Sequence, residues 1–408
     1  MKIIRKILSS IKNWILDIRS TFYLKKVKRK GHSASKKMKV GFVVFEPETW
    51  DKLSPIYNSL KNNENIVVNL IIVPSYDQEL RVTTQYGKEL AFFENIDSKA
   101  LLAYNNGTWI NIKRENYDYI FYQDPYNNHM PFKLKSSHVV KFSKICYIPY
   151  GYTGSNDFNE GNTNKSFFRN VYYEFVDVIE IKNILCERYK QNVEKGFQHF
   201  VNYGYPSFEQ IDLIQSMHKI KKILWTPRWS YEPKIGGSHF FEYKEKIVSL
   251  AKTYPLINVA IRPHPMMFNN FINNGLMDKD EKENYCDKLK ENDIEISQGL
   301  DLETEFCKTD LLITDWSSII PMFFLTGKPI IYCVSDIELN LECSLISEGM
   351  YLAYSWDDIE KHVKDLIQGN DYLFDKRNMI IKKMQKEHRG ATERIINELY
   401  NDYVNSEI

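Results

Sequence analysis

Two segments in the second half of the chain place a charged or titratable group directly after an apolar run. Arg228 follows the run at residues 223–226, and its planar guanidinium suits a phosphate and keeps its charge at any physiological pH. Arg262 and His264 follow the run at residues 257–261 in the sequence Arg-Pro-His-Pro. The prolines restrict the backbone around the imidazole, so His264 is held rigidly enough to bind phosphate or move a proton.

A third segment, Thr-Asp-Trp-Ser-Ser at residues 314–318, follows the apolar run at residues 311–314. The pattern predicts a helix from Ser317, with Ser317 or Ser318 as its cap and free N–H groups at its positive end. Capping alone would also explain two serines at this place. Because the three segments follow strands of one predicted sheet, we expect them to bind one diphosphate through these residues: Arg228, Arg262, His264, Thr314, Asp315, Ser317 and Ser318.

The sequence lacks the common motifs of several other chemistries. It has no glycine-rich dinucleotide fingerprint, P-loop, nucleophile elbow or HExxH motif. Its six cysteines form no CxxC pair and show no metal spacing, which indicates reduced thiols. We therefore expect neither a resident metal nor a cofactor. Outside a basic N-terminal segment, nothing points to nucleic acid.

The N-terminal segment is strongly basic and has the period of an amphipathic helix. Residues 1–39 hold 13 Lys or Arg and one acid, Asp17. Lys12, Asp17 and Arg19 interrupt the apolar run, so the segment is predicted neither to span a bilayer nor to act as a signal peptide. We expect residues 1–30 to lie on an anionic membrane surface, with packing on the protein body as the alternative. The predicted apolar face consists of Ile7, Leu8, Ile11, Trp14, Ile15, Ile18 and Phe22.

The remainder of the chain alternates between apolar runs and helical patterns in two blocks. Continuous Val, Ile and Phe runs bounded by turn residues are typical of parallel strands covered on both faces. The pattern therefore predicts two doubly wound α/β domains facing a cleft. We predict strands at residues 39–45, 66–73, 117–122, 145–148, 223–226, 257–261, 294–296, 311–314 and 330–334. We predict helices at residues 50–61, 240–254, 278–291, 356–368, 372–388 and 391–404.

These segments together resemble the CDP-glycerol glycerophosphotransferase family, the polymerases and primases of wall teichoic acid. The resemblance covers roughly residues 200–400 and also includes Gly-Tyr-Pro at 204–206, Gly-Lys-Pro at 327–329 and Gly-Ala-Thr-Glu-Arg at 390–394. It implies a GT-B-like fold and transfer of a polyol phosphate from a CDP-polyol to a lipid-linked or polymeric hydroxyl, with release of CMP. It also implies a peripheral location on the cytoplasmic face of the membrane.

The sequence predicts three parts, and the resemblance implies the roles of the last two. We expect residues 1–37 to be a membrane-associating segment and linker, 38–205 a Rossmann-like acceptor domain, and 206–408 a Rossmann-like nucleotide-donor domain with terminal helices. His264 is a catalytic candidate as well as a donor contact. At the place of the family's N-terminal His-Gly pair, this chain has Tyr150 followed by glycine. A tyrosine with an ordinary pKa of about 10 is a weak base at neutral pH.

The sequence leaves open which residue acts as the base on the acceptor hydroxyl, and it leaves two other functions open. The base that takes the acceptor's proton is expected to be Asp124, at the end of the strand at residues 117–122, or Tyr150; Asp124 also fits a plain turn residue. The first alternative function is a GT-B glycosyltransferase that uses a nucleotide sugar for capsule or surface polysaccharide. The second is a non-catalytic, membrane-bound binding protein.

Overall fold

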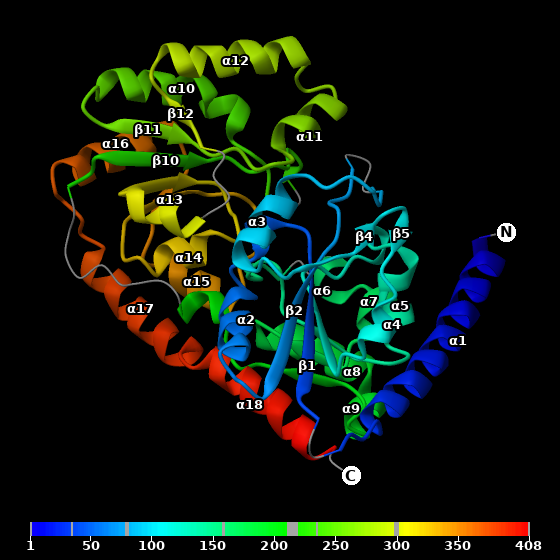
Figure 1. Cartoon of the computed structure of the whole chain (residues 1–408). Helices are drawn as coiled ribbons and strands as arrows, with labels where there is room; N and C mark the ends of the chain where they lie inside the picture. Colours follow the sequence, from blue (N-terminus) through cyan, green and yellow to red (C-terminus); the bar gives the residue numbers. More distant parts are fainter. Residues whose placement is uncertain are drawn as a thin grey trace. The chain divides into compact units, whose positions relative to one another are not determined.

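The computed structural model describes residues 2–33, 36–77, 81–156, 160–209, 219–233, 236–297 and 302–406. The chain divides into two compact units. The first comprises Met1–Gly151, Phe158–Glu209 and His388–Ile408, and the second comprises Tyr152–Asp157 and Gln210–Glu387. Each unit contains one parallel β-sheet with helices packed on it (Figure 1), which confirms the predicted α/β class.

The sheet of the first unit has seven strands in the order β3-β2-β1-β6-β7-β8-β9, and all neighbours are parallel. Its central strands are almost wholly buried because their apolar runs face helices on both sides. Phe42 and Phe121 stack across β1 and β6 with ring centroids 4.9 Å apart. The strands are β1 Met38–Val44, β2 Ile66–Ile72, β3 Leu101–Leu102, β6 Tyr119–Tyr122, β7 Lys144–Tyr147, β8 Tyr173–Phe175 and β9 His199–Val201.

The first α-helix after β1 begins four residues later than the sequence predicted. The helix expected from residue 50 begins at Ser54, as α2 Ser54–Lys61, with a proline in its first turn, where no backbone N–H is needed. It packs against β2. The others include α3 Lys88–Ile96, α4 Ile112–Glu115, α5 Ser136–Val139, α7 Lys165–Phe168, α8 Ile179–Arg188, α9 Lys190–Glu194 and α18 Ala391–Val404.

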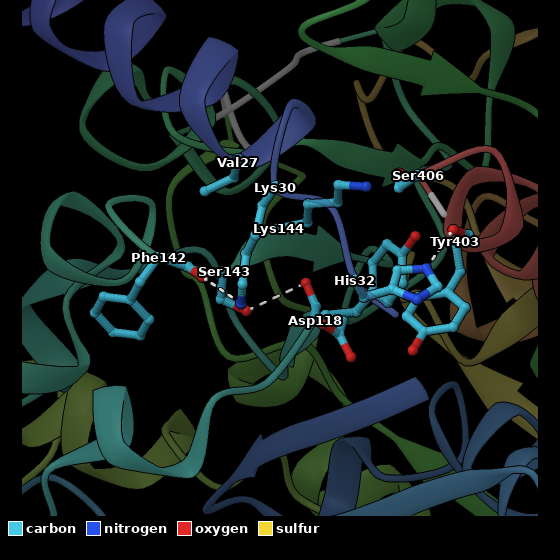
Figure 2. A pocket seen from close by; sticks show the side chains of 10 residues that line it. Val27, Lys30, His32, Asp118, Phe142, Ser143, Lys144, Tyr403 and Ser406 are labelled. Carbon is cyan, nitrogen blue, oxygen red and sulfur yellow. Dashed lines mark hydrogen bonds between the residues drawn. The ribbon is translucent and has the colours of Figure 1, made fainter. Parts of the chain in front are cut away.

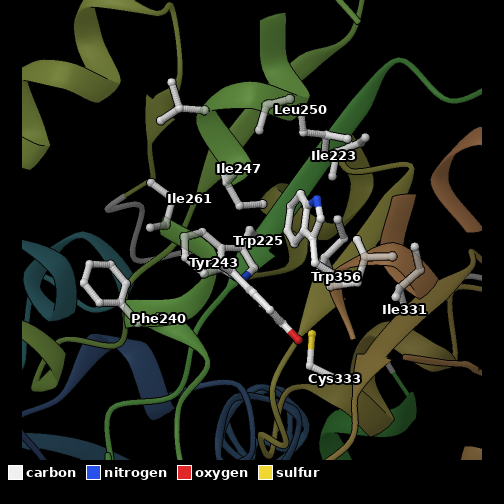
Figure 3. Packing of buried hydrophobic residues seen from close by; sticks show 14 of the residues in the cluster. Ile223, Trp225, Phe240, Tyr243, Ile247, Leu250, Ile261, Ile331, Cys333 and Trp356 are labelled. Carbon is white, nitrogen blue, oxygen red and sulfur yellow. The ribbon is translucent and has the colours of Figure 1, made fainter. Parts of the chain in front are cut away.

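The sheet of the second unit has six strands in the order β12-β11-β10-β13-β14-β15, again all parallel. Trp225 on β10 stacks on Phe240 at the start of α10, with ring centroids 5.9 Å apart, inside the apolar cluster of Figure 3. The strands are β10 Lys222–Thr226, β11 Asn258–Ile261, β12 Glu295–Ile296, β13 Leu311–Thr314, β14 Ile330–Cys333 and β15 Tyr351–Ala353. The longer helices are α10 Phe240–Thr253, α12 Lys279–Glu291, α16 Trp356–Ile367 and α17 Phe374–His388.

The last helix belongs to the first unit, whereas the sequence placed residues 206–408 in one domain. Asp402 on α18 accepts hydrogen bonds from Lys144 Nζ (2.6 Å) and from the Tyr172 hydroxyl (3.1 Å). Tyr119 on β6 donates to the carbonyl of Leu399 (3.2 Å). The chain therefore returns to the first sheet through contacts more than 200 residues apart in sequence, which no local pattern reveals.

The predicted N-terminal helix is present as α1 Lys2–Lys28, and its C-terminal end is fixed to the first unit. Leu24 and Val27 are buried, and Ser20 donates to Asn170 Oδ1 (2.8 Å). Beyond the helix, His32 stacks on Tyr403 with ring centroids 3.7 Å apart (Figure 2). Among the described residues, no helix is long and apolar enough to cross a bilayer.

The apolar face of α1 does not pack on the described body of the protein. Trp14, Phe22 and Leu8 are 64%, 63% and 61% exposed. Ile11, Ile15 and Ile18 are also exposed, and these six side chains recur at helical spacing along one face. This stretch of the helix contacts the body of the protein through polar side chains instead, as where Arg169 donates to Asn13 Oδ1 (2.8 Å), and its apolar row stays uncovered.

Candidate functional site

The segments after β10 and β13 leave the second sheet side by side. Thr226 and Thr314 are register partners at the carboxyl ends of these strands, and their hydroxyls lie 2.6 Å apart. The backbone N–H of Arg228 donates to Asp315 Oδ2 (2.8 Å), and Arg228 Nη1 donates to the carbonyl of Trp316 (2.6 Å). The predicted meeting of these two segments at one sheet edge is therefore present in the structure.

Arg228 retains hydrogen-bonding capacity in this arrangement. Its Nε is buried and has no hydrogen-bond partner among the described residues. Desolvation lowers the pKa of the guanidinium while the Asp315 carboxylate opposes that shift, and an arginine so placed stays charged. An unsatisfied buried N–H costs free energy unless a ligand accepts from it, so this fork is suited to a phosphate oxygen.

His264 lies close to the same guanidinium. Desolvation by the surrounding loops, and then the positive charges of Arg228 and Arg262, lower the pKa of His264, although the side chain keeps a surface open to solvent that moderates the shift. The Nδ1 atom accepts from the backbone N–H of Met266 (3.2 Å), so the proton of the neutral ring is assigned to Nε2. With Nε2 as its donor, His264 can contact a phosphate oxygen beside the guanidinium of Arg228. Arg262 itself donates to Ser297 Oγ (3.3 Å).

Asp315 and Thr314 form hydrogen bonds within the protein at this edge of the sheet. Asp315 is buried, and its carboxylate also accepts from the ring Nδ1 of His239 (2.6 Å). The Thr314 hydroxyl is engaged by Thr226 and donates to the carbonyl of Asp315 (2.6 Å). Both residues were predicted as donor contacts, but their polar atoms are already committed within the protein. We therefore assign them to positioning the loops that carry Arg228.

Sequence reasoning missed His239. The hydrogen bond to Asp315, opposed by desolvation, raises the pKa of His239, and the imidazole stacks on Tyr243 with ring centroids 5.1 Å apart. His239 precedes α10, and a lone histidine before a helix gave no signal that it would meet the carboxylate of Asp315, which follows β13. Together with Cys333, these side chains bring three possible metal-ligand atoms within 4.8 Å. However, burial raises the pKa of the Cys333 thiol well above its usual range, which keeps the thiol protonated.

The predicted serine cap is wrong. The helix after β13 is α14 Ile320–Phe324, its N-cap is Ile319, and no side chain caps it. The chain makes a turn before the helix begins, and Ser317 contributes its carbonyl to the N–H of Ile320 (3.1 Å). The Ser317 and Ser318 hydroxyls make no hydrogen bond to any described residue. They are therefore open to a ligand as side-chain donors rather than as caps.

A second polar group lies at the carboxyl end of β6 in the first unit. Asp124 is buried, and its Oδ2 is hydrogen-bonded to Nδ1 of the buried His129. The other carboxylate oxygen accepts from the backbone N–H of Tyr126 (3.0 Å), and the His129 ring stacks on Tyr76 at 4.0 Å. No described residue hydrogen-bonds the remaining ring nitrogen of His129. The pair has the arrangement of a carboxylate that orients an imidazole base.

The surroundings of this pair contain further shifted groups. Desolvation lowers the pKa of the buried Lys52 to about 7 and raises the pKa of Glu46, which accepts from the Tyr76 hydroxyl (2.5 Å). Desolvation also raises the pKa of the partly exposed Tyr150, whose hydroxyl lies 3.3 Å from that of Tyr126. A phenol with a raised pKa stays protonated at neutral pH, so this shift argues against Tyr150 as the base. Such clustering is typical of functional sites.

The second unit holds most of the residues that match a known protein family. Residues 212–395 match the family model of CDP-Glycerol:Poly(glycerophosphate) glycerophosphotransferase. The match confirms the resemblance and the enzyme class predicted from the sequence, a CDP-glycerol glycerophosphotransferase-like transferase. No curated protein sequence matches this chain.

Solved structures show the fold. The wall teichoic acid polymerase TagF is similar with a TM-score of 0.52 and 14% identity, over 98% of each chain. UDP-GlcNAc 2-epimerase from Neisseria meningitidis, bound to UDP-GlcNAc, has a TM-score of 0.56 and 14% identity, over 89% of this chain and 100% of that chain. The epimerase from Methanocaldococcus jannaschii has a TM-score of 0.55 and 15% identity, over 89% and 100%. These likenesses confirm the GT-B-like fold with two Rossmann-like sheets.

The glycerophosphotransferase match covers one of the two polar groups described above. Arg228, His264 and both serines lie inside the matched residues 212–395. Asp124, His129 and Tyr150 lie outside it. The family match therefore bears on the group around Arg228, while the pair at the end of β6 is known from geometry alone. The signal for His129 in the sequence was a histidine five residues after an acid at a strand end.

Gly154 provides a test of how the Arg228 loop is held. A Cβ at Gly154 would lie 1.9 Å from Cζ2 of Trp316, whose carbonyl binds Arg228. The backbone at Gly154 is held in place, since its carbonyl accepts a hydrogen bond from the N–H of Asn340 (3.0 Å). We expect Gly154→Ala to destabilise the protein by about 1–3 kcal/mol and to weaken nucleotide binding about tenfold. Thermal unfolding and calorimetric titration with CMP measure both effects, and unchanged values for both would contradict the proposed support of Arg228.

Proposed function

We propose that this chain transfers a polyol phosphate, glycerol phosphate or a close relative, from a CDP-polyol to a hydroxyl of a lipid-linked or polymeric acceptor, with release of CMP. The observation that carries the proposal is the hydrogen bond of Arg228 to the carbonyl of Trp316 (2.6 Å), which brings the guanidinium to the loop of Ser317 within the residues that match the glycerophosphotransferase family. The positive charge of Arg228 also acts on His264. The match supports the reaction class, and the geometry supports a site for a diphosphate.

The proposed donor site stabilises charge rather than making covalent bonds. The acceptor oxygen attacks the phosphorus that carries the polyol, the bond from that phosphorus to the bridging oxygen breaks, and CMP leaves with the bridging oxygen. Negative charge therefore grows on CMP. Arg228 and the Nε2–H of His264 would hold the diphosphate, with the hydroxyls of Ser317 and Ser318 as further donors, and preorganised donors of this kind lower the barrier.

The acceptor hydroxyl must lose a proton during the attack, and we propose His129 as the base. Asp124 binds Nδ1 of His129, which leaves Nε2 as the atom that takes the proton. This assignment differs from both bases suggested by the sequence. Asp124 becomes the residue that orients the imidazole, and Tyr150 stays protonated beside Tyr126.

Nucleotide binding separates the proposal from a sugar transferase. In calorimetric titrations with CDP-glycerol, CMP, UDP-GlcNAc and a GDP-sugar, we expect only the two cytidine nucleotides to bind. Binding of a UDP- or GDP-sugar alone would instead support a glycosyltransferase of surface polysaccharide. Tight binding of CDP-glycerol without turnover on any hydroxyl acceptor would support a non-catalytic binding protein.

We also propose that the enzyme is peripheral on an anionic membrane, at the cytoplasmic face. The support is the row of six exposed apolar side chains on α1, with Lys12 and Arg19 on the same helix and three lysines in its last turn. A helix of this kind buries its apolar face among the lipid headgroups while its cations attract anionic lipid.

Substitution on this face tests the membrane proposal. We expect Trp14→Ser combined with Ile18→Ser to lower binding to phosphatidylglycerol vesicles at least about tenfold, because each buried apolar side chain contributes about 1.5–3 kcal/mol. The matched control is Leu256→Ser with Leu341→Ser, two apolar side chains that are 96% and 82% exposed on the second unit. Equal sedimentation of both variants and the native protein with vesicles would contradict a role for α1.

A further inference from the structure

A pocket of about 910 Å³ lies beside the C-terminal turns of α1. One wall is the end of this helix and the residues that follow it, and the other walls come from α4 and from residues 138–142. All of these segments belong to the first unit. Neither the family match at residues 212–395 nor the proposed chemistry uses this pocket.

The pocket is lined by cations without a compensating acid. No acidic residue lines it, and its six lysine and arginine side chains are Lys25, Lys26, Arg29, Lys30, Lys113 and Lys141. Lys30 Nζ donates to neutral oxygens, Asn116 Oδ1 (2.9 Å) and the carbonyl of Phe142 (3.3 Å). The neighbouring acid Asp118 is already paired with Lys36 (2.7 Å).

The positive charge of the pocket affects the pKa of a histidine in its wall. Desolvation, followed by the positive charges of Lys141, Lys113 and Lys133, lowers the pKa of His138 in the pocket wall. Like charges brought together in this way stabilise a bound anion. Multiple lysines with free ammonium groups suit a phosphate or diphosphate rather than a single carboxylate.

The position of the pocket indicates how an anion would arrive. Phe22 lines the pocket and is also the last residue of the exposed apolar row on α1. Tyr23 and Phe142 add further aromatic surface to the walls. A ligand with an anionic head and an apolar tail would therefore find cations inside the pocket and apolar side chains at its edge.

We propose that this pocket binds the phosphate or diphosphate headgroup of a lipid anchored in the membrane on which α1 lies. The proposal rests on the proposed membrane association, and it adds a specific headgroup site that involves α4 and residues 138–142 as well as α1. The occupant is a lipid rather than a soluble polyanion because the cations adjoin the apolar row. A lipid held here would be kept beside the enzyme that acts at the same surface.

The test uses farnesyl diphosphate as a soluble lipid diphosphate, so that it does not depend on membrane binding. We expect the full-length protein to bind it and Lys113→Glu with Lys141→Glu to weaken binding at least about tenfold, since reversal of two charges removes attraction and adds repulsion. Neither lysine forms an ion pair with a described residue, so the fold should persist. The control variant is Lys221→Glu with Lys252→Glu, two exposed lysines on the second unit.

Three results bear on the inference. Weaker binding in the pocket variant alone supports it, and equal affinities for all three proteins overturn it. Inorganic diphosphate that binds as tightly as farnesyl diphosphate also overturns it, in favour of a soluble polyanion. Titration with CMP is carried out on the same samples. Its failure in every variant would reject the proposed transferase while leaving the headgroup site standing.

Discussion

Replacement of Arg228 by lysine should lower kcat/KM for CDP-glycerol by about two to three orders of magnitude, the usual effect of removing a donor from a preorganised anion site. The guanidinium reaches the carbonyl of Trp316 through one nitrogen while its buried Nε has no described partner. Lysine keeps the charge but has a single ammonium group, so it cannot bind the carbonyl and the phosphate in the same fork geometry.

A comparison of the loss in kcat with the loss in CMP affinity distinguishes two roles for Arg228, stabilisation of the leaving CMP and binding of the nucleotide alone. If the residue stabilises the leaving CMP, kcat should fall more than the affinity for CMP measured by titration. The matched control is Arg81→Lys, an exposed arginine of the first unit that is paired with Asp77. Activity of Arg228→Lys within about twofold of the native enzyme would remove the guanidinium from the proposed site.

Replacement of His129 by asparagine should lower kcat by about two to four orders of magnitude, the range expected for loss of a general base. Asparagine keeps a side-chain N–H that can donate to Asp124, so the loop should remain folded. The measurement is the steady-state release of CMP by both proteins, and a loss confined to KM would contradict a role of His129 in proton transfer.

Two further variants show whether His129 acts through chemistry or through structure. Asp124→Asn should lower activity because the amide no longer selects the reactive tautomer of the imidazole. Tyr150→Phe should retain activity within several-fold, because a protonated phenol is not the base. A His129→Asn enzyme with native activity, together with an inactive Tyr150→Phe, would return the base to Tyr150.

The sequence predicted the strands more reliably than the ends of the helices. Continuous apolar runs mark β1, β2, β6, β10, β11, β13 and β14 because a parallel strand is buried on both faces. β3 and β15, of two and three residues, were missed. The predicted serine cap was wrong because a turn intervenes before Ile320. A serine in such a turn and a serine at an N-cap look alike in the sequence.

Residues of the candidate site were found in the sequence only where the signal was local. Arg228 and His264 were found because each follows an apolar run within a short, rigid segment. His239 was missed since it meets Asp315 across 76 residues of sequence. His129 was missed although Asp124 lies only five residues before it, because the spacing does not show that the turn brings the two side chains together. The commitment of Thr314 to Thr226 likewise depends on the register of β10 and β13.

The most direct measurement is the release of CMP from CDP-glycerol by the full-length protein, with a hydroxyl-bearing lipid acceptor present in anionic vesicles. We predict that CMP appears in equal amount with a new phosphodiester on the acceptor, and that Arg228→Lys and His129→Asn both suppress it. Formation of a glycosidic bond from UDP-GlcNAc, with CDP-glycerol left intact under the same conditions, would contradict the proposed transfer of a polyol phosphate.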